Sequence, residues 1–142
     1  MKKKLTESDF WKGLKKNTED YGVYWSRVET LSCPGIPDLH GMKDGVGFWI
    51  ELKVHRLKSL KNILLRPHQI AWQTRYCSHG GLVVNLVAHP SSQTINIFHG
   101  TRAIEIAGQD TENHGSCSPD WSSTEDFRGA IDYIVSYGKQ KQ

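Results

Sequence analysis

The spacing of hydrophobic and polar residues along the chain predicts alternating helices and strands. Helices are expected where apolar residues recur at helical spacing between capping signals, over 6–17, 67–78 and 127–137. Strands are expected where apolar and polar residues alternate, or where an apolar run is bounded by turn residues, over 21–31, 38–42, 47–54, 82–88, 95–98 and 101–106. The polar residues 108–123 predict a surface loop. The order is α-β-β-β-α-β, then a hairpin around His99-Gly100 and a closing helix, which predicts a mixed α/β fold.

The strand over 47–54 has two different faces. Because side chains alternate along a strand, one face carries apolar residues suited to a core, namely Phe48, Ile50, Leu52 and Val54. Glu51 and Lys53 share the other face, about 6–7 Å apart along the strand, and Trp49 lies on that face too. An acid and an amine in the middle of such a strand indicate a chemical role. The alternative is an ion pair on an exposed sheet face.

Asp38 lies 13 residues before Glu51, on the preceding strand and across a hairpin turn at Lys43-Asp44-Gly45. Two adjacent strands can bring these carboxylates to one divalent cation, since Mg²⁺ binds one or two carboxylates together with phosphate and water. Lys53 can then activate water or offset phosphate charge. Gly35, just before Asp38, leaves space for a backbone or a phosphate. Asp38 by itself would be read as a turn acid, but with Glu51 and Lys53 it fits a metal-dependent phosphodiesterase site.

These residues resemble a known signature. Ile36-Pro37-Asp38 followed by Ile50-Glu51-Leu52-Lys53 resembles the PD-(D/E)xK motif of the restriction-endonuclease-like nucleases. With Arg66-Pro67-His68-Gln69-Ile70-Ala71-Trp72 added, the pattern is similar to the VRR-NUC and archaeal Holliday-junction-resolvase-like branches over about residues 7–88. The resemblance implies a restriction-endonuclease-like core within a single nuclease domain over 1–142. That core would span about 6–88, and 89–142 would be a C-terminal elaboration.

The resemblance also implies a role for each matching residue. Asp38 and Glu51, with the backbone carbonyl of Leu52, would hold Mg²⁺ or Mn²⁺, and Lys53 would be the catalytic lysine. Gln69 matches a glutamine that points toward the site and orients substrate or water.

A further acid on the first helix is implied for resolvase-like members. Glu7 takes that place here as an additional catalytic residue and metal ligand. Glu19 at the end of the same helix and Glu29 on the next strand are the alternatives.

The activity that the resemblance implies is a Mg²⁺- or Mn²⁺-dependent DNA endonuclease that leaves 5′-phosphate and 3′-hydroxyl ends. Branched DNA such as a Holliday junction is the first expected substrate. Nicking, flap, single-strand or duplex cleavage of the VRR-NUC type is the enzymatic alternative. A catalytically silent DNA-binding module and a structural protein are alternatives of other classes.

A junction has two equivalent scissile phosphates, so a resolving enzyme needs two matched sites, and a homodimer is expected. The expected interface is the hairpin over 95–106 and the helix over 127–137, with Tyr133 and Tyr137 exposed. The alternative is that this helix packs on its own sheet.

The net charge is +3, but basic and acidic residues are unevenly distributed along the chain. Residues 1–75 carry 14 Lys and Arg against 8 Asp and Glu, whereas 76–142 carry 4 against 7. The segment 53–68 contains no acidic residue. Four of its basic side chains are expected to contact the DNA backbone: Arg56, Lys58, Lys61 and Arg66. A solvated loop is the alternative for this segment.

Other features narrow the class of protein. No apolar run approaches the roughly 20 residues of a membrane helix, and Glu7 and Asp9 stand where a secretory signal would be apolar. Three cysteines are an odd number without close pairing, which fits a reducing compartment. His114 and Cys117 have ligand-like spacing but lack a second pair. We therefore expect no membrane partner and a cytoplasmic location, in a bacterium or a phage-infected cell.

Overall fold

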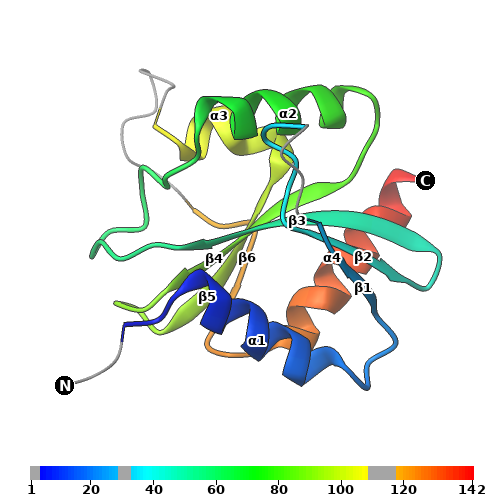
Figure 1. Ribbon diagram of the computed structural model, residues 1–142, viewed down its shortest axis with the longest axis horizontal. Helices are drawn as coiled ribbons and strands as arrows, with labels where there is room; N and C mark the ends of the chain where they lie inside the picture. Colours follow the sequence, from blue (N-terminus) through cyan, green and yellow to red (C-terminus); the bar gives the residue numbers. More distant parts are fainter. Residues whose placement is uncertain (1–3, 29–32, 109–117) are drawn as a thin grey trace.

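The fold is built on one mixed six-stranded sheet in a computed structural model that describes residues 4–28, 33–108 and 118–142 (Figure 1). The strands lie in chain order, and they are β1 (Tyr24–Arg27), β2 (Leu39–Lys43), β3 (Val46–Val54), β4 (Val83–His89), β5 (Thr94–His99) and β6 (Trp121–Ser123). β3 and β4 are parallel, and the other neighbouring strands pair antiparallel. The parallel pair requires a crossover, which a helix supplies.

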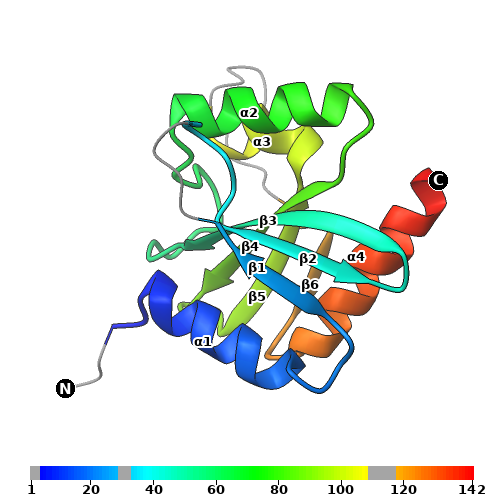
Figure 2. The same ribbon diagram turned by 45° about the vertical axis from the view of Figure 1, so that its right-hand side comes forward.

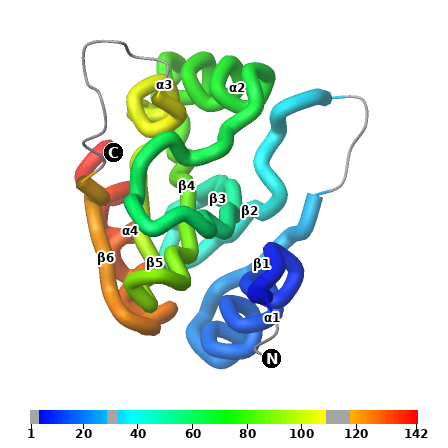
Figure 3. The backbone as a smooth tube through the Cα atoms, turned by 90° about the vertical axis from the view of Figure 1, so that its left-hand side faces the viewer, coloured from blue at the N-terminus to red at the C-terminus, as the bar shows by residue number. Residues whose placement is uncertain are grey.

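Helices cover both faces of the sheet, so the molecule has three layers (Figure 1, Figure 2). The helices are α1 (Glu7–Thr18), α2 (Pro67–Ser78), α3 (Ala103–Ile106) and α4 (Phe127–Lys141), and a 3₁₀ turn, η1 (Gly100–Arg102), precedes α3. α1 and α4 lie on one face, and α2 and α3 lie on the other, as Figure 3 also shows. α2 is the crossover between β3 and β4.

Each face of the sheet has its own hydrophobic core. The core under α1 and α4 includes Phe10, Leu14, Phe48, Ile50, Leu86 and Ile131. The core under α2 and α3 is smaller and includes Ile63, Leu65, Ile70, Val87, Phe98 and Ile106. The alternation predicted for β3 is confirmed, because Phe48, Ile50 and Leu52 are buried in the first core. Glu51 therefore faces the layer that contains α2.

The turn between β2 and β3 has the predicted chemistry. Asp44 and Gly45 have φ values of 51° and 80°, the left-handed conformations of a two-residue type I′ turn. The turn fixes the antiparallel register, in which Lys43 pairs with Val46 and Leu39 pairs with Ile50. This register sets which residue of β3 lies opposite the start of β2.

Most of the predicted elements are confirmed, and the three main helices begin within a residue of the expected positions. The strand predicted over 101–106 is wrong: this segment is helical in η1 and α3. Ala103 and Ile106, three residues apart, are fully buried on one side of α3, so helical spacing serves the second core there. β5 instead pairs with β6, a strand inside the predicted loop over 108–123, of which 109–117 lie outside the described residues.

The strand predicted over 21–31 is shorter in the structure and spans only β1, and residues 29–32 lie outside the description. None of the described helices combines the length and hydrophobicity needed to cross a bilayer.

Candidate active site

Asp38 and Glu51 come together through the register of β2 and β3. Because Leu39 pairs with Ile50, the preceding Asp38 lies opposite Glu51. Directly opposite residues share a face of the sheet, with Cβ atoms about 4.5–5.5 Å apart. The Glu51 side chain is buried at 1% exposure, whereas Asp38 is partly exposed. The two acids therefore form one pair, with Asp38 on the solvent side.

This pair has unusual electrostatics. The pKa of Glu51 is raised to about 9. Burial is the largest cause, a hydrogen bond with Asp38 and the charges of Asp38 and Glu7 also raise it, and Lys53 opposes the shift. A carboxyl with such a pKa keeps its proton at neutral pH unless a cation compensates its charge. The site is thus short of positive charge, which is a property of carboxylate pairs that bind metal ions.

Gln69 connects the acid to the lysine. Its Nε2 donates to Glu51 Oε1 at 2.6 Å, and its Oε1 accepts from Lys53 Nζ at 3.2 Å. The same Oε1 accepts the backbone N–H of Arg66 at 2.9 Å, as the third residue of a helix does in a capping box. The start of α2 therefore fixes the orientation of the Gln69 amide, and with it the relative positions of Glu51 and Lys53.

A second polar pair holds α2 on the sheet. Gln73, one helical turn after Gln69, exchanges two hydrogen bonds of 2.8 Å with Asn85 of β4. Both side chains are fully buried, and Asn85 is the partner of Glu51 in the parallel register. The sequence reading missed this pair. Two adjacent contacts of this kind prevent α2 from sliding along the sheet.

Glu7 lies beside the pair but does not complete a cluster. It lines a small cavity of about 100 Å³ together with Asp38 and Leu52, and its charge acts on Glu51. Within residues 4–28, 33–108 and 118–142, no three His, Cys, Asp or Glu side chains converge as a metal-binding group. Of the two alternative acids, Glu19 lies at the other end of α1 and Glu29 lies outside the described residues.

Gly35 serves the backbone rather than a phosphate. Its φ is +88°, and a Cβ there would lie 2.1 Å from the carbonyl oxygen of His68. The loop before Asp38 thus packs directly against the first turn of α2. Of the two uses that the sequence left open for Gly35, the structure has the close backbone approach.

The basic segment leads away from this site along the loop between β3 and α2. Arg56, Lys58, Lys61 and Arg66 are all exposed. A cavity of about 280 Å³ runs from Lys53 and Glu7 to Arg56 and Leu64. Arg56 also donates to the backbone carbonyl of Leu5 at 2.7 Å, which links the loop to the start of α1.

Two buried histidines fix the same loop. His55 Nε2 lies 2.7 Å from the Ser59 carbonyl, and His89 Nε2 lies 2.8 Å from the Leu57 carbonyl. Since a carbonyl only accepts, each ring is protonated at Nε2 and donates to the loop backbone. The cations of the basic segment are therefore held on an anchored loop.

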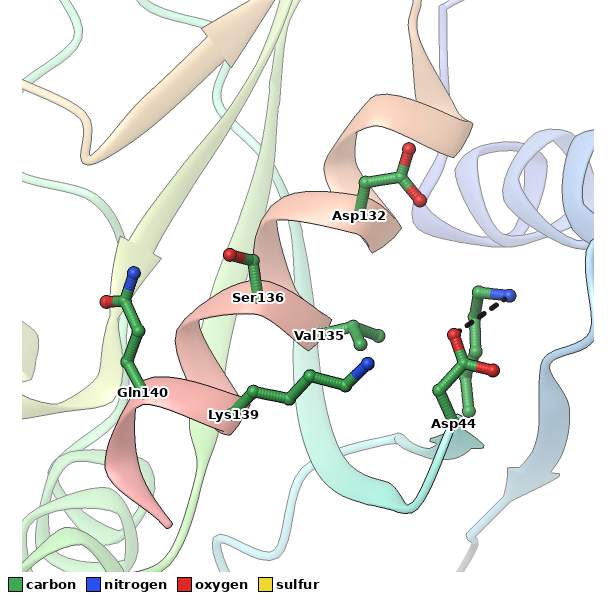
Figure 4. Close-up of a pocket in the computed structure, with 7 residues that line it drawn as sticks. Asp44, Asp132, Val135, Ser136, Lys139 and Gln140 are labelled. Atoms are coloured by element: carbon green, nitrogen blue, oxygen red, sulfur yellow. Dashed lines mark ion pairs between the residues drawn. The ribbon is translucent and has the colours of Figure 1, made fainter.

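A cavity between the β2–β3 turn and α4 contains none of the candidate residues. Figure 4 shows this cavity of about 430 Å³, in which Asp44 of the β2–β3 turn faces Asp132 and Lys139 of α4. Lys43 is 3.6 Å from Asp44 there. Opposite charges alternate around this cavity, so it lacks the one-signed field expected around a phosphodiester.

The expectation that α4 exposes Tyr133 and Tyr137 is wrong. Both tyrosines are half-buried, and both rings stack on His99, with centroid distances of 5.8 and 4.0 Å. Tyr133 Oη is also 2.7 Å from His99 Nε2. The alternative interpretation holds: this helix packs on its own sheet. His114 and Cys117 lie outside the described residues.

Comparison with known proteins identifies the fold. No protein-family model and no curated protein matches the chain. Among solved structures, it is similar to Hjc, a Holliday junction resolvase from the archaeon Archaeoglobus fulgidus, with a TM-score of 0.50 and 19% sequence identity. The match covers 66% of this chain and 76% of the Hjc chain. At this identity the likeness shows the fold, and the restriction-endonuclease-like α/β architecture predicted from the sequence is confirmed.

Proposed function

We propose that the chain is a divalent-metal-dependent DNA endonuclease whose active site is the Asp38–Glu51 pair. The observation that carries this proposal is the buried Glu51 beside Asp38, joined through Gln69 to Lys53. A restriction-endonuclease-like fold hosts this arrangement, and the basic segment lies at its edge.

The residues present fit a hard cation such as Mg²⁺ or Mn²⁺. Asp38 and Glu51, with the carbonyl of Leu52, would supply oxygen ligands, and Glu7 would stand at the margin of the site. When bound, the cation would lower the pKa of a coordinated water and offset phosphate charge. Lys53, held by Gln69, would stabilise the charge that develops on the phosphate during in-line attack. Gln69 would keep the Glu51 carboxylate aimed at the metal.

Branched DNA is the proposed substrate, because the solved structure that the chain resembles is a Holliday junction resolvase. A panel of four-way junction, flap, single-stranded and duplex DNA tests this. We expect cleavage with Mg²⁺ or Mn²⁺, loss of cleavage with EDTA, and the highest rate on branched DNA. Cleavage of flaps or duplex alone would favour the VRR-NUC type of activity. DNA binding without cleavage of any substrate would indicate that the protein is a catalytically silent DNA-binding module.

The basic segment is proposed to supply affinity without sequence preference. The combined change Arg56→Gln, Lys58→Gln and Lys61→Gln should weaken binding to all DNA sequences. It should also reduce the slope of log K against log salt by roughly 0.9 for each lost phosphate contact. Anisotropy titrations at several salt concentrations measure this slope.

The matched control neutralises three exposed lysines on α1, Lys12, Lys15 and Lys16. Their replacement by Gln should change the slope much less. Equal effects of the two triple variants would mean that the basic segment is an ordinary solvated loop.

A homodimer is proposed for the resolving form, because paired cuts at a junction require two sites related by a two-fold axis. Sedimentation of the free protein and of its junction complex at micromolar concentration measures the assembly. A monomer in both states would exclude paired resolution and favour a nicking or flap nuclease.

A further inference from the structure

A cavity beside the candidate active site is lined by aromatic and basic side chains of one helix face. Its volume is about 470 Å³, within the roughly 300–1,000 Å³ of typical ligand sites. The residues from α2 and its C-cap recur at helical spacing, and they are His68, Ala71, Trp72, Arg75, Tyr76 and His79. Cys33 and Pro34, in the loop before β2, line the other side. We refer to this space as the Trp72 cavity.

The aromatic rings form a continuous series from the sheet to the helix. Trp72 and Tyr76 stack with centroids 4.6 Å apart and ring planes 15° apart. Trp49 of β3 packs edge-on against Trp72 at 5.7 Å, and His40 of β2 packs against Trp49 at 4.8 Å. These contacts hold Trp72 rigidly at the wall of the cavity.

The series of rings leads directly to the acid pair. Trp49 is two residues before Glu51 on the same face of β3, and Gln69 is one helical turn before Trp72. The Trp72 cavity is therefore adjacent to the candidate active site along both β3 and α2.

The α2 side of the Trp72 cavity carries positive and no negative side chains. α2 contains no acidic residue, and Arg75 is exposed on it, with exposed His68 and His79 at its two ends. The opposite side of the helix is used for packing, through Ile70 and Gln73. Aromatic rings beside a cation form the usual surface for an unpaired nucleotide, because every base can stack and every phosphate is an anion.

We propose that the Trp72 cavity binds an unpaired nucleotide of the DNA substrate. The base would pack against the Trp72–Tyr76 rings, and its phosphate would lie near Arg75. A base within a duplex is already paired and stacked, so it cannot enter such a cavity without being extruded. This inference rests on the proposed nuclease function and narrows its branched substrate to one that presents an unpaired nucleotide at or near the cleavage site.

Binding measurements without divalent ions test this apart from catalysis. The probes are a labelled blunt duplex and the same duplex with a single-stranded thymidine arm, titrated in EDTA and followed by anisotropy. Trp72→Leu should weaken binding of the armed duplex by about tenfold, since stacking of one base on an aromatic ring is worth about 1–3 kcal/mol. Binding of the blunt duplex should change by less than about twofold, as one lost stacking contact affects only the unpaired strand.

Arg75→Gln keeps the test valid if Trp72→Leu fails to fold, because Arg75 is exposed and the side chains of Ser78 and His79 hydrogen-bond to its backbone carbonyl, which the substitution leaves in place. It should weaken binding of the armed duplex selectively. The matched control is Lys139→Gln, which removes one exposed positive charge from α4 on the other face of the sheet and should leave both affinities nearly unchanged.

A direct readout is photocrosslinking with 5-iododeoxyuridine in the single-stranded arm. Crosslinks to Trp72 or Tyr76 would support the proposal. Crosslinks confined to other surfaces, equal losses on both DNAs, or a change in sedimentation that marks the cavity as a contact between two copies would overturn it. Selective binding of the armed duplex with no cleavage in Mg²⁺ or Mn²⁺ would support the cavity and refute the proposed nuclease activity.

Discussion

Glu51→Gln should lower the rate of DNA cleavage by about 10²–10³-fold, the scale on which removing a charge-stabilising group acts. The substitution keeps the size of the side chain and its ability to accept the 2.6 Å hydrogen bond from Gln69. It removes the negative charge that the site would offer to a metal ion. DNA binding in EDTA should persist, because Glu51 keeps its proton when no cation is present and the substitution therefore removes no charge there. Single-turnover cleavage and anisotropy measure the two effects.

Asp38→Asn and Lys53→Met should have comparable effects on cleavage, because residues that act on one phosphate as a unit are not additive. Glu19→Gln is the matched control, since Glu19 is an exposed acid at the far end of α1. Its activity should equal that of the wild type. Near-wild-type cleavage by Glu51→Gln would refute the assignment of the active site.

The relative positions of the main candidate residues were predictable because short-range signals determine them. The Asp44-Gly45 turn fixes the register of β2 and β3, and that register alone places Asp38 opposite Glu51. Strand parity then places Glu51 and Lys53 on the same face, and Gln69 follows from the first turn of a helix that Pro67 begins. Each step depends on residues that are close in sequence or on adjacent strands.

The features that the sequence did not predict depend on contacts between segments that are distant in the chain. Asn85 lies in a run of apolar residues, and only the placement of α2 shows that Gln73 is its partner. The segment over 101–106 contains β-branched residues that favour a strand, but its packing against α2 and β5 favours a short helix. Tyr133 and Tyr137 looked exposed on a helical wheel, whereas His99 of β5 covers them.

The Trp72 cavity illustrates a weaker signal in the sequence. His68, Trp72, Arg75 and His79 recur at helical spacing, which does predict a shared face. Aromatic residues on a helix are usually core residues, so the sequence alone favoured burial. The stacking of Tyr76 on Trp72 beside an open cavity is a tertiary feature, and only the structure supplies it.

The buried proton of Glu51 also has a consequence for stability. A carboxyl whose pKa rises from 4.5 to about 9 on folding binds more protons in the folded state between these values. Stability therefore falls as pH increases through this range, and the loss is complete above pH 9. Glu51→Gln removes the ionisable group, so in EDTA at pH 7.5 the variant should be more stable than the wild type by about 2–4 kcal/mol, given 1.36 kcal/mol per pKa unit.

Thermal unfolding in EDTA from pH 4.5 to 9 measures this difference. The melting temperatures of wild type and Glu51→Gln should be similar at pH 4.5 and diverge by roughly 5–10 °C by pH 8. Added Mg²⁺ should then stabilise the wild type and not the variant, since a ligand stabilises only the state that binds it. Glu19→Gln should follow the wild type throughout. A constant difference at all pH values would show that Glu51 has the same pKa in the folded and unfolded states. The folded site would then hold no buried proton for a metal ion to displace.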